Sequence, residues 1–549
     1  LIRHTIYDEL GPAARVELHR RVGETIESLG GGDAYLTDLA HHWVAATPTV
    51  MVRAEDVAKA ARYAGDAGRR AMASLAYEEA VHHLEGALRA TRQVGTDAQT
   101  CDVLIALGEA QRCAGDPAHR ETLLEAGHLA LEQADAHRAA RAALANHRGV
   151  FSRLGSVDRE RVTALEAALA VSPEANSVRA RLLAALATEL HFEGEEHRLA
   201  LARESLDIAR QLDDAATLAE TLSALWLAAW GSTEESLRGP LATELNEVAG
   251  ALGDRTLEFN AAVAMFLTAT GGGEPERAKN ALSNCVRISE ALGQPVLRWR
   301  VAYLQSQWAV AIGRLDDVEH WAAESQRLGD AAGQPDTDPF WVAPLATIRV
   351  LQGRAGEALE LVTPLIERFP AVAFFPGMRA WALSEEGRSD EARAILAGLR
   401  QPGGFRGVPA DYMRLFVLSL LSRACYGLRE PAMAKELFDL LIPFRSAMAT
   451  QQSTWLGPVS HNLGLLATVL GRHDDAHQYF AEAVEAQDRM GAQVHVVHTR
   501  LEWARLLLQR GPEHASQARA LLEEAKAGAQ AVGLPIIEAR IDELAALRP

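Results

Sequence analysis

The chain reads Gly471-Arg472-His473-Asp474-Asp475-Ala476, and three earlier segments, which begin at Gly313, Gly353 and Gly387, read alike. In each segment the glycine supplies the left-handed residue that ends one helix. The carboxylates that follow the arginine then occupy the first turn of the next helix, where the helix dipole favours negative charge. Each segment is therefore predicted to be a joint between two helices.

The spacing of these joints is regular. The first three glycines are 40 and 34 residues apart, and a variant joint at Gly427-Leu428-Arg429 divides the following gap of 84 residues into 40 and 44. Two helices per unit, at a period of about 34 to 45 residues, are the signature of an α-solenoid, in which each repeat buries one face on the next. An irregular helical bundle rich in alanine is the alternative interpretation.

Small residues recur at fixed positions within the units. Around the fourth joint they are Leu463-Gly464 and Ala467 before the glycine, with Ala476, Phe480 and Ala483 after it. This pattern resembles the tetratricopeptide repeat (TPR), in which small side chains let the two helices of a repeat close. We expect an all-α, TPR-like solenoid, a right-handed superhelix of helix pairs, in which Gly464 and Ala476 meet where two helices cross.

Composition agrees with a solenoid and excludes several functions. Hydrophobic residues make up 48% of the 549 residues but aromatic residues only 6%, so alanine and leucine carry the core. The net charge of −18 argues against direct nucleic-acid contact, which depends on clustered Lys and Arg. Acidic and basic residues alternate at helical spacing in segments such as 385–393, which predicts a solvated face.

Apolar runs and cysteines in the sequence indicate where the protein is located. No apolar run reaches the roughly 18 residues that a membrane span requires, and no signal peptide is recognisable. The four cysteines lie far apart without a Cys-x-x-Cys pair, as expected in a reducing compartment. We expect a cytoplasmic protein without membrane contact, and the start at Leu1 rather than Met suggests a fragment of a longer chain.

Motifs for catalysis are missing from the sequence. It has no P-loop, no Gly-x-Ser-x-Gly elbow, no His-Glu-x-x-His and no Rossmann fingerprint, so we expect no catalytic, cofactor-binding or metal-binding residue in this chain. The pairs His473/His477 and His495/His498 have helical metal-site spacing but no thiolate partner, and are interpreted as surface histidines. The adjacent pair His41-His42 points to different sides of a helix, which excludes joint ligation within one helix.

The first 45 residues carry a second resemblance. Residues 1–10 and 15–24, followed by Asp38-Leu39-Ala40-His41-His42-Trp43 and by residues 73–80, resemble the end of a winged-helix subdomain and the first repeat behind it in signal-transduction ATPases of the STAND class. In that family an ATPase module precedes the TPR arm and is coupled to a LuxR-type DNA-binding domain or to an adenylate/guanylate cyclase domain. The resemblance implies an ATPase domain upstream of Leu1 as a partner of this chain. ATP and Mg²⁺ are expected to bind that domain and not this chain.

The resemblance and the repeats together predict the domain organisation. Residues 1–50 are expected to be a remnant winged-helix tail and connector, 51–290 an N-terminal TPR-like arc, and 291–549 a C-terminal TPR-like arc. No basic recognition helix is found before Pro549, so a LuxR-type output is not expected in this segment, and a natural stop at Pro549 would favour the cyclase-type or an output-free architecture.

Two places in the second arc are candidates for a partner-binding groove. Arg298, Gln305 and Trp308 share one stripe of a helix, whereas Trp299 is about 100° off that stripe and is expected in the core. The polar segment 450–458 contains Gln452 and Trp455, and an indole in a polar loop is unusual. The alternative is that these tryptophans fill gaps between repeats and that the loop is a linker.

The predicted function is that of a sensor or protein-interaction arm of a bacterial STAND ATPase or transcriptional regulator, binding a protein partner or a small inducer in the solenoid groove. One alternative is the regulatory TPR region of a multidomain adenylate/guanylate cyclase. Another is a freestanding TPR scaffold without an ATPase. The chain itself is not expected to be an enzyme.

Overall fold

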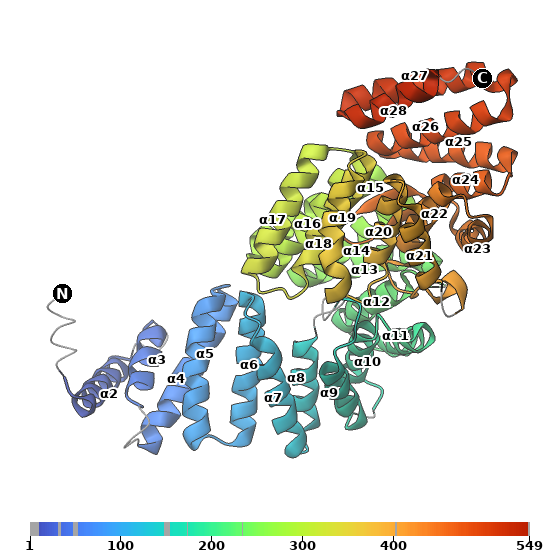
Figure 1. Ribbon diagram of the computed structural model, residues 1–549. Coiled ribbons are helices and arrows are strands. Elements are labelled where there is room, and N and C mark those ends of the chain that lie inside the picture. Colours follow the sequence, from blue (N-terminus) through green and yellow to red (C-terminus); the bar gives the residue numbers. More distant parts are fainter. Residues whose placement is uncertain are drawn as a thin grey trace.

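The computed structural model describes residues 10–30, 34–47, 53–147, 154–172, 174–232, 234–400 and 403–546. Within these residues 27 α-helices follow one another, joined by short turns, and a single two-stranded hairpin interrupts them. Consecutive helices pack side by side along the whole described chain (Figure 1). The chain is an all-α solenoid of TPR-like helix pairs.

The first part of the stack, blue to teal in Figure 1, is extended and consists of α2 (Pro12–Ser28), α3 (Leu36–Ala45), α4 (Ala54–Ala73), α5 (Tyr77–Val94), α6 (Asp97–Ala114), α7 (His119–Glu132) and α8 (Ala136–Asn146). The stack then turns through α9 (Arg159–Ala170), α10 (Ser177–Glu189), α11 (Glu195–Ala209), α12 (Ala215–Ala229), the 3-10 turn η2 (Glu235–Leu237), α13 (Arg238–Leu252), α14 (Arg255–Gly272) and α15 (Pro275–Leu292).

The second half continues with α16 (Pro295–Ile312), α17 (Leu315–Ala331), α18 (Thr337–Leu351), α19 (Ala355–Arg368), α20 (Phe374–Glu385), α21 (Ser389–Leu399), η3 (Gly404–Gly407), α22 (Arg414–Leu428), α23 (Pro431–Leu441) and η4 (Ile442–Phe444). It ends with β1 (Met448–Thr450), β2 (Trp455–Pro458), α24 (Val459–Val469), α25 (His473–Met490), α26 (Gln493–Arg510), η5 (Pro512–His514), α27 (Ala515–Val532) and α28 (Pro535–Ala546).

The glycine joints form as the sequence predicts. Gly313, Gly353, Gly387 and Gly471 have φ between 69° and 80° and end their helices in the left-handed conformation. The carboxylates that follow each arginine lie in the first turn of the next helix. The variant joint differs, because the left-handed residue there is Arg429, with φ 54°, rather than the glycine two positions earlier.

Helices within a repeat approach closely at glycines that face a large side chain. A Cβ added to Gly464 of α24 would lie 2.7 Å from the Phe480 ring of α25, and one added to Gly68 of α4 would lie 2.6 Å from Leu84 of α5. The close crossing is confirmed, and the side chain nearest to Gly464 is that of Phe480, one turn after Ala476. The three atoms nearest to a Cβ at Gly464 all belong to Phe480, because the aromatic ring one turn further along α25 fills the space that the missing side chain leaves.

Charged side chains connect successive repeats. The guanidinium of Arg393 lies 2.8 Å from Glu430, that of Arg400 2.8 Å from Glu436, and that of Arg181 2.7 Å from Glu220. The partners in these pairs are 36 to 39 residues apart, which is the repeat period. The alternating charges are thus only partly a solvated face, since some of them join one repeat to the next.

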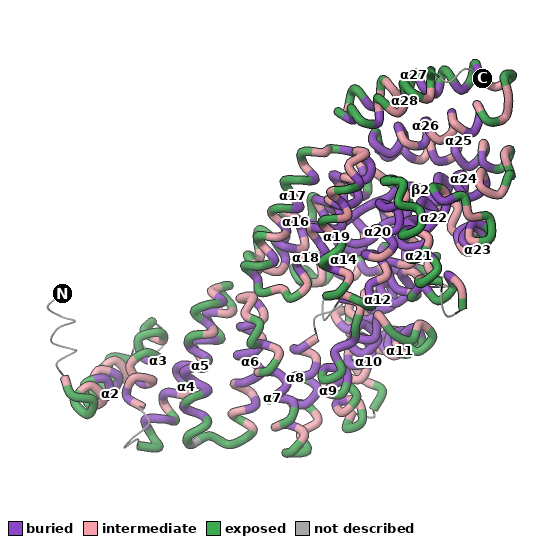
Figure 2. The backbone as a smooth tube through the Cα atoms, viewed as in Figure 1, coloured by how far each residue is buried: buried purple, intermediate pink, exposed green. Residues whose placement is uncertain are grey.

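Segments far apart in the sequence also lie against each other. The backbone N–H of Leu154 donates to Asp336 at 2.7 Å, Tyr77 donates to the carbonyl of Leu292 at 3.2 Å, and His498 Nε2 lies 2.7 Å from the carbonyl oxygen of Leu351. We call these bonds, which span 147 to 215 residues, the closing contacts. In the middle of the molecule, where distant repeats pack against one another, most residues are buried (Figure 2).

The hydrophobic core reflects this arrangement. One continuous cluster runs from Leu154 to Ile541, and three smaller clusters lie in the first part of the chain, between Leu39 and Leu190. The predicted arc boundary at 290/291 falls in the last turn of α15, and the three-part division stays a prediction. The winged-helix remnant also stays a prediction, and residues 1–9 of its signature lie outside the described residues.

Along the described ranges, no helix combines the length and the apolar character that crossing a membrane requires.

Candidate ligand-binding cleft

The polar segment 450–458 is a buried hairpin rather than an exposed loop. β1 and β2 pair antiparallel and pack among α14, α16, α22 and α25. Trp455 is 0% exposed, and its indole N–H donates to the carbonyl of Thr270 at 3.4 Å. The expectation that Trp455 offers a surface to a partner is therefore wrong in this structure, because the ring fills the core between distant repeats.

Gln452 is also buried, at 3% exposure, in the turn of the hairpin. Its side-chain oxygen accepts a hydrogen bond from the Tyr303 hydroxyl of α16 at 3.3 Å. Gln307, one turn along α16, donates to the carbonyl of Gln451 at 2.7 Å and to the Thr450 hydroxyl. The hairpin thus covers the inner side of α16 and bonds to it through Thr450, Gln451 and Gln452, which explains how a hydrophilic segment can lie in a core, although Thr454 Oγ1 has no partner among the described residues.

The other predicted groove residues lie elsewhere on α16. Trp299 is in the core, at 1% exposure, with its ring against Tyr303 and Phe340, as predicted. Gln305 and Trp308 are half-buried and together line a hollow of about 220 Å³ between α15, α16 and α17. Arg298 is exposed and does not line this hollow. The structure therefore brings together two of the five predicted residues.

A larger cavity, of about 680 Å³, opens between the α12–α15 region and the segment from α22 to β1. Apolar groups line much of it, among them Trp230, Leu415, Phe444 and Met448. At the end of α14, the backbone of glycines 271 to 273 forms another part of the cavity wall. We call this cavity the inner cleft.

Arg238, the first residue of α13, gives the inner cleft its most unusual feature. It is 4% exposed, and its guanidinium carbon lies 4.7 Å from the ring centre of Trp226 and 4.1 Å from that of Trp230. Its Nη1 donates to Glu235 at 2.7 Å, whereas Nε and Nη2 have no hydrogen-bond partner among the described residues. Burial lowers the pKa of Arg238, but a guanidinium stays charged in proteins.

A buried cation with two unused donors is costly unless something pairs with it. Among the described residues Glu235 is the one carboxylate bonded to Arg238, and two further arginines, Arg414 and Arg489, line the same cleft together with Glu274. Arg414 is half-buried and Arg489 is exposed, so both lie nearer to its mouth. The inner cleft can therefore hold an anionic group deep inside and an apolar group beside it.

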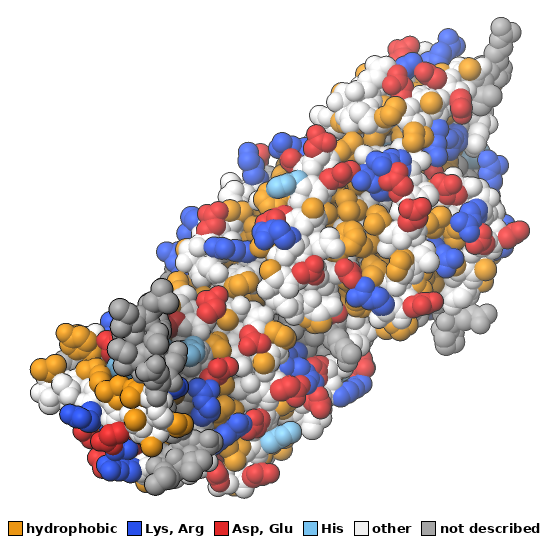
Figure 3. Space-filling view, turned by 60° about the vertical axis from the view of Figure 1, so that its left-hand side comes forward, with side chains coloured by type: hydrophobic (Ala, Val, Ile, Leu, Met, Phe, Trp, Pro, Cys, Tyr) orange, Lys and Arg blue, Asp and Glu red, His pale blue; other side chains and the backbone are white. Residues whose placement is uncertain are grey.

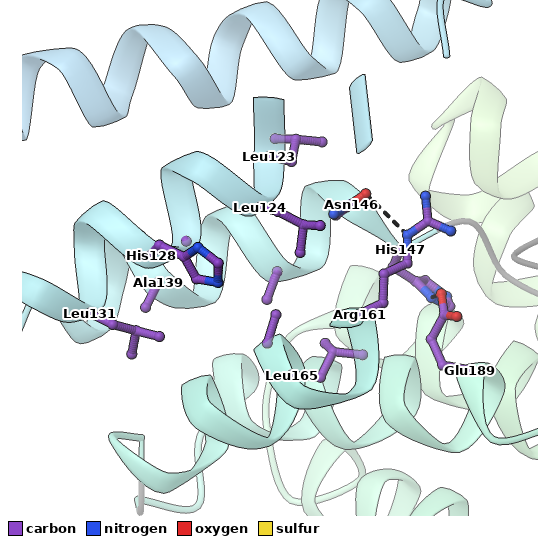
Figure 4. A pocket seen from close by; sticks show the side chains of 13 residues that line it. Leu123, Leu124, His128, Leu131, Ala139, Asn146, His147, Arg161, Leu165 and Glu189 are labelled. Carbon is purple, nitrogen blue, oxygen red and sulfur yellow. Dashed lines mark hydrogen bonds and ion pairs between the residues drawn. The ribbon is translucent and has the colours of Figure 1, made fainter. Parts of the chain in front are cut away.

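The remaining cavities offer less. A cleft of about 390 Å³ shares Trp230 with the inner cleft and reaches Gln452 and His147. A third cavity, between α7, α8 and α9, has a volume of only about 20 Å³, close to the room that one water needs (Figure 4). Beside it Arg161 donates to Asn146 at 3.2 Å, which supports packing rather than ligand binding.

The face of the molecule drawn in Figure 3 is not strongly polarised. Blue and red side chains are interspersed on it over the whole length of the molecule, with orange side chains between them. That the chain does not contact nucleic acid, which requires clustered positive charge, stays a prediction.

Two of the histidine predictions need correction. His495 is buried, with Nε2 3.3 Å from the carbonyl oxygen of Val310, and His498 is half-buried in a closing contact, so neither is a simple surface histidine. His477 accepts a hydrogen bond from the Trp503 indole at 3.0 Å. These rings satisfy backbone and indole groups of other helices.

Sequence reasoning missed Arg238. The spacing of Trp226 and Trp230 places both indoles on one face of a helix, which is a signal for an aromatic pair. Nothing in the sequence indicates that an arginine of the next helix lies over both rings.

Comparisons with known proteins give distant likenesses. No protein-family model and no curated protein sequence match the chain. Among solved structures, yeast Tom70 superposes with a TM-score of 0.32 at 12% identity, covering 90% of this chain and 98% of Tom70. The APC/C hetero-tetramer Cut9–Hcn1 gives a TM-score of 0.30 at 12% identity, covering 88% of this chain and 96% of the other. At these scores the description of the chain as a TPR-like solenoid rests on its own helix pairs, joints and repeat period.

Proposed function

We propose that the chain is a binding arm, which receives an anionic group of a small inducer or a protein partner in the inner cleft. The observation that carries the proposal is Arg238, which lies over two indoles with two donors unused. A guanidinium fixed in this way recognises a carboxylate or phosphate with little loss of side-chain freedom. The apolar wall then favours a ligand that also carries an acyl or aromatic part.

The wider context of this proposal comes from the sequence. The resemblance of residues 1–24 and 38–43 to the segment behind STAND ATPase modules supports a sensor arm in a cytoplasmic signal-transduction ATPase, with ATP and Mg²⁺ bound upstream. A regulatory arm of an adenylate/guanylate cyclase and a freestanding scaffold are the alternatives. Reading the coding sequence upstream of Leu1 for a P-loop, and beyond it for the carboxylate pair of a cyclase, discriminates among the three.

A second candidate surface is the hollow that Gln305 and Trp308 line, because both side chains are half-buried and accessible from outside. Trp308 packs edge-on against Phe266 at 6.5 Å and leaves part of its ring to solvent. A protein partner could use that ring as an anchor.

The inner cleft is tested by calorimetry and thermal shift with aromatic carboxylates, acyl carboxylates and phosphomonoesters. Arg238→Met keeps an unbranched side chain over the two indoles but removes the donors, and Arg414→Gln removes a charge nearer to the mouth. Both variants should weaken a bound anion at least about tenfold, since hydrogen bonds to charged groups are worth roughly 1.5 to 3 kcal/mol.

The matched control is Arg298→Gln, which removes an exposed arginine that does not line the inner cleft. It should leave binding unchanged. The proposed site would be contradicted if Arg238→Met and Arg414→Gln bound the ligand as tightly as Arg298→Gln and the unmodified chain do. It would also be contradicted if none of the tested anions bound.

A further inference from the structure

Three histidines meet at the beginning of the described chain. His19 belongs to α2, whereas His41 and His42 are neighbours in α3. One ring nitrogen of each lies within 4.8 Å of those of the other two, and Nδ1 of His19 is 2.8 Å from Nδ1 of His42. The ring centres of His41 and His42 are 5.1 Å apart.

This geometry corrects the expectation that the adjacent pair cannot ligate jointly. Consecutive residues do point about 100° apart on a helix. A third helix-borne ring can still lie between the two directions, and His19 of α2 does so, with ring centres 5.5 Å from His41 and 5.0 Å from His42.

The packing of α2 and α3 fixes the position of this cluster. Gly23, one turn after His19, faces the indole of Trp43, where a Cβ would lie 2.8 Å from the ring. Next to His19, Arg20 donates to the buried carboxylate of Asp56 in α4 at 2.8 Å. The three rings are therefore brought together by contacts on both sides, and not by a flexible loop.

The chemical state of the rings suits a metal ion. His19 is 6% exposed, and burial together with the two neighbouring histidines lowers its pKa to about 4. The pKa of His42 is lowered as well, mainly by burial. Both rings are thus neutral near pH 7, and the neutral imidazole is the form that binds metals.

The separations between the ring nitrogens of the three histidines are close to those of nitrogens that bind one metal ion. Zinc binds imidazole nitrogen at about 2.0 to 2.1 Å, which at tetrahedral angles separates two ligand nitrogens by roughly 3.3 Å. Separations between 2.8 and 4.8 Å need only small rotations of the rings. His41 is exposed and His42 half-buried, so the centre faces solvent and water can complete the coordination.

We propose that His19, His41 and His42 bind one divalent transition-metal ion, with zinc as the reference ion, and that the ion fastens α2 to α3. Three neutral imidazoles are ligands of intermediate softness, which suit zinc, copper and nickel far better than magnesium or calcium. Within the described ranges no thiolate or carboxylate belongs to the cluster. The ion would fix the first described helix against the repeats that follow.

The test uses the full chain without a polyhistidine tag, stripped of metal by a chelator and titrated with zinc chloride in a calorimeter. We expect one equivalent to bind at micromolar concentration. Cobalt(II) in place of zinc should give the intense visible bands of a low-coordinate nitrogen site, and zinc should abolish them.

His41→Ala is the decisive variant, since its side chain is exposed and its removal leaves the packing of α2 and α3 intact. It should weaken zinc binding at least about tenfold, and His42→Ala should do the same. His197→Ala, which removes an exposed histidine of α11, is the matched control and should bind like the unmodified chain. No zinc uptake by the unmodified chain, or equal uptake by His41→Ala and His197→Ala, would overturn the proposal.

Discussion

Gly231 lies directly against the backbone of Asp411, so that a Cβ added to the glycine would stand 1.8 Å from the carbonyl oxygen of Asp411. The two residues are 180 positions apart in the sequence. Further bonds hold the segment around Asp411 to the α10–α11 region, since Tyr412 donates its backbone N–H to His191 at 3.3 Å and Arg198 of α11 donates to the carbonyl of Ala410. The glycine is thus required by a contact between distant repeats as well as by its φ of 72°.

Gly231→Ala should therefore lower the free energy of unfolding by about 3 kcal/mol or more, because it adds a clash with backbone to the cost of a left-handed alanine. Gly293→Ala is the control: Gly293 has φ 67°, with open space where its Cβ would be, so only about 1 to 2 kcal/mol should be lost. Urea unfolding of both variants makes the comparison. Equal losses would mean that the contact with Asp411 does not constrain the fold.

Gly464→Leu should overpack the crossing of α24 and α25 and cost about 1 to 3 kcal/mol, because the added side chain meets the Phe480 ring. The same change at Gly250, an exposed position in α13 where a Cβ meets nothing within 4 Å, should leave the thermal midpoint almost unchanged. A midpoint of Gly464→Leu equal to that of Gly250→Leu would refute the close crossing.

Acidification should destabilise the chain through His498. Burial lowers the pKa of His498 to about 4 from its ordinary 6.5. The unfolded chain therefore takes up a proton between pH 6.5 and 4 that the folded chain does not, and stability falls as the pH falls through this window, by at most about 3 kcal/mol. Asp411, whose pKa burial raises to about 6, acts in the opposite direction, because stability from it is lost as the pH rises.

The measurement that isolates His498 is the difference between the unmodified chain and His498→Gln, which keeps a donor for the carbonyl of Leu351. When denaturation is measured between pH 4 and 7, the free energy of unfolding should fall less on acidification in His498→Gln than in the unmodified chain. Parallel curves would mean that His498 does not titrate in this range.

Mg-ATP should not bind the isolated chain, because the sequence has no P-loop and no other phosphate-cradling glycine motif. Calorimetry at micromolar chain concentration should give only heats of dilution. Stoichiometric micromolar binding would mean that a nucleotide site was missed, and competition by the anions that bind the inner cleft would then locate it.

The helix pairs could be predicted because their determinants are local. A left-handed glycine, the arginine after it and the carboxylates of the next turn act within a few residues, as at Gly353 and Gly471, so the pattern predicts the joint. The variant joint at Gly427-Leu428-Arg429 also falls where the sequence predicts, but it depends on a different residue. Arg429 adopts the left-handed conformation there, and Gly427 faces Ser384, where an added Cβ would lie 3.1 Å from the side chain.

The candidate site was much less predictable, since its determinants are distant in sequence. Gln452 and Trp455 look like parts of an exposed loop until the partners of their polar atoms, Tyr303 and the carbonyl of Thr270, are known. Hydropathy treats such a segment as exposed, because it has no term for a hydrogen bond made 149 or 185 residues away. Arg238 and its two indoles escape prediction for the same reason.

The closing contacts have a mechanical consequence. A solenoid whose repeats contact only their neighbours stretches and recoils like a spring, and each repeat yields nearly independently under load. Here the bonds from Leu154 to Asp336 and from His498 to Leu351 tie loops of the coil to one another. The region from Leu154 onward should thus resist extension as a stiff block that yields in one step. The bond from Tyr77 to Leu292 ties α5 to the same block, so α2 to α4, which precede it, remain the compliant end.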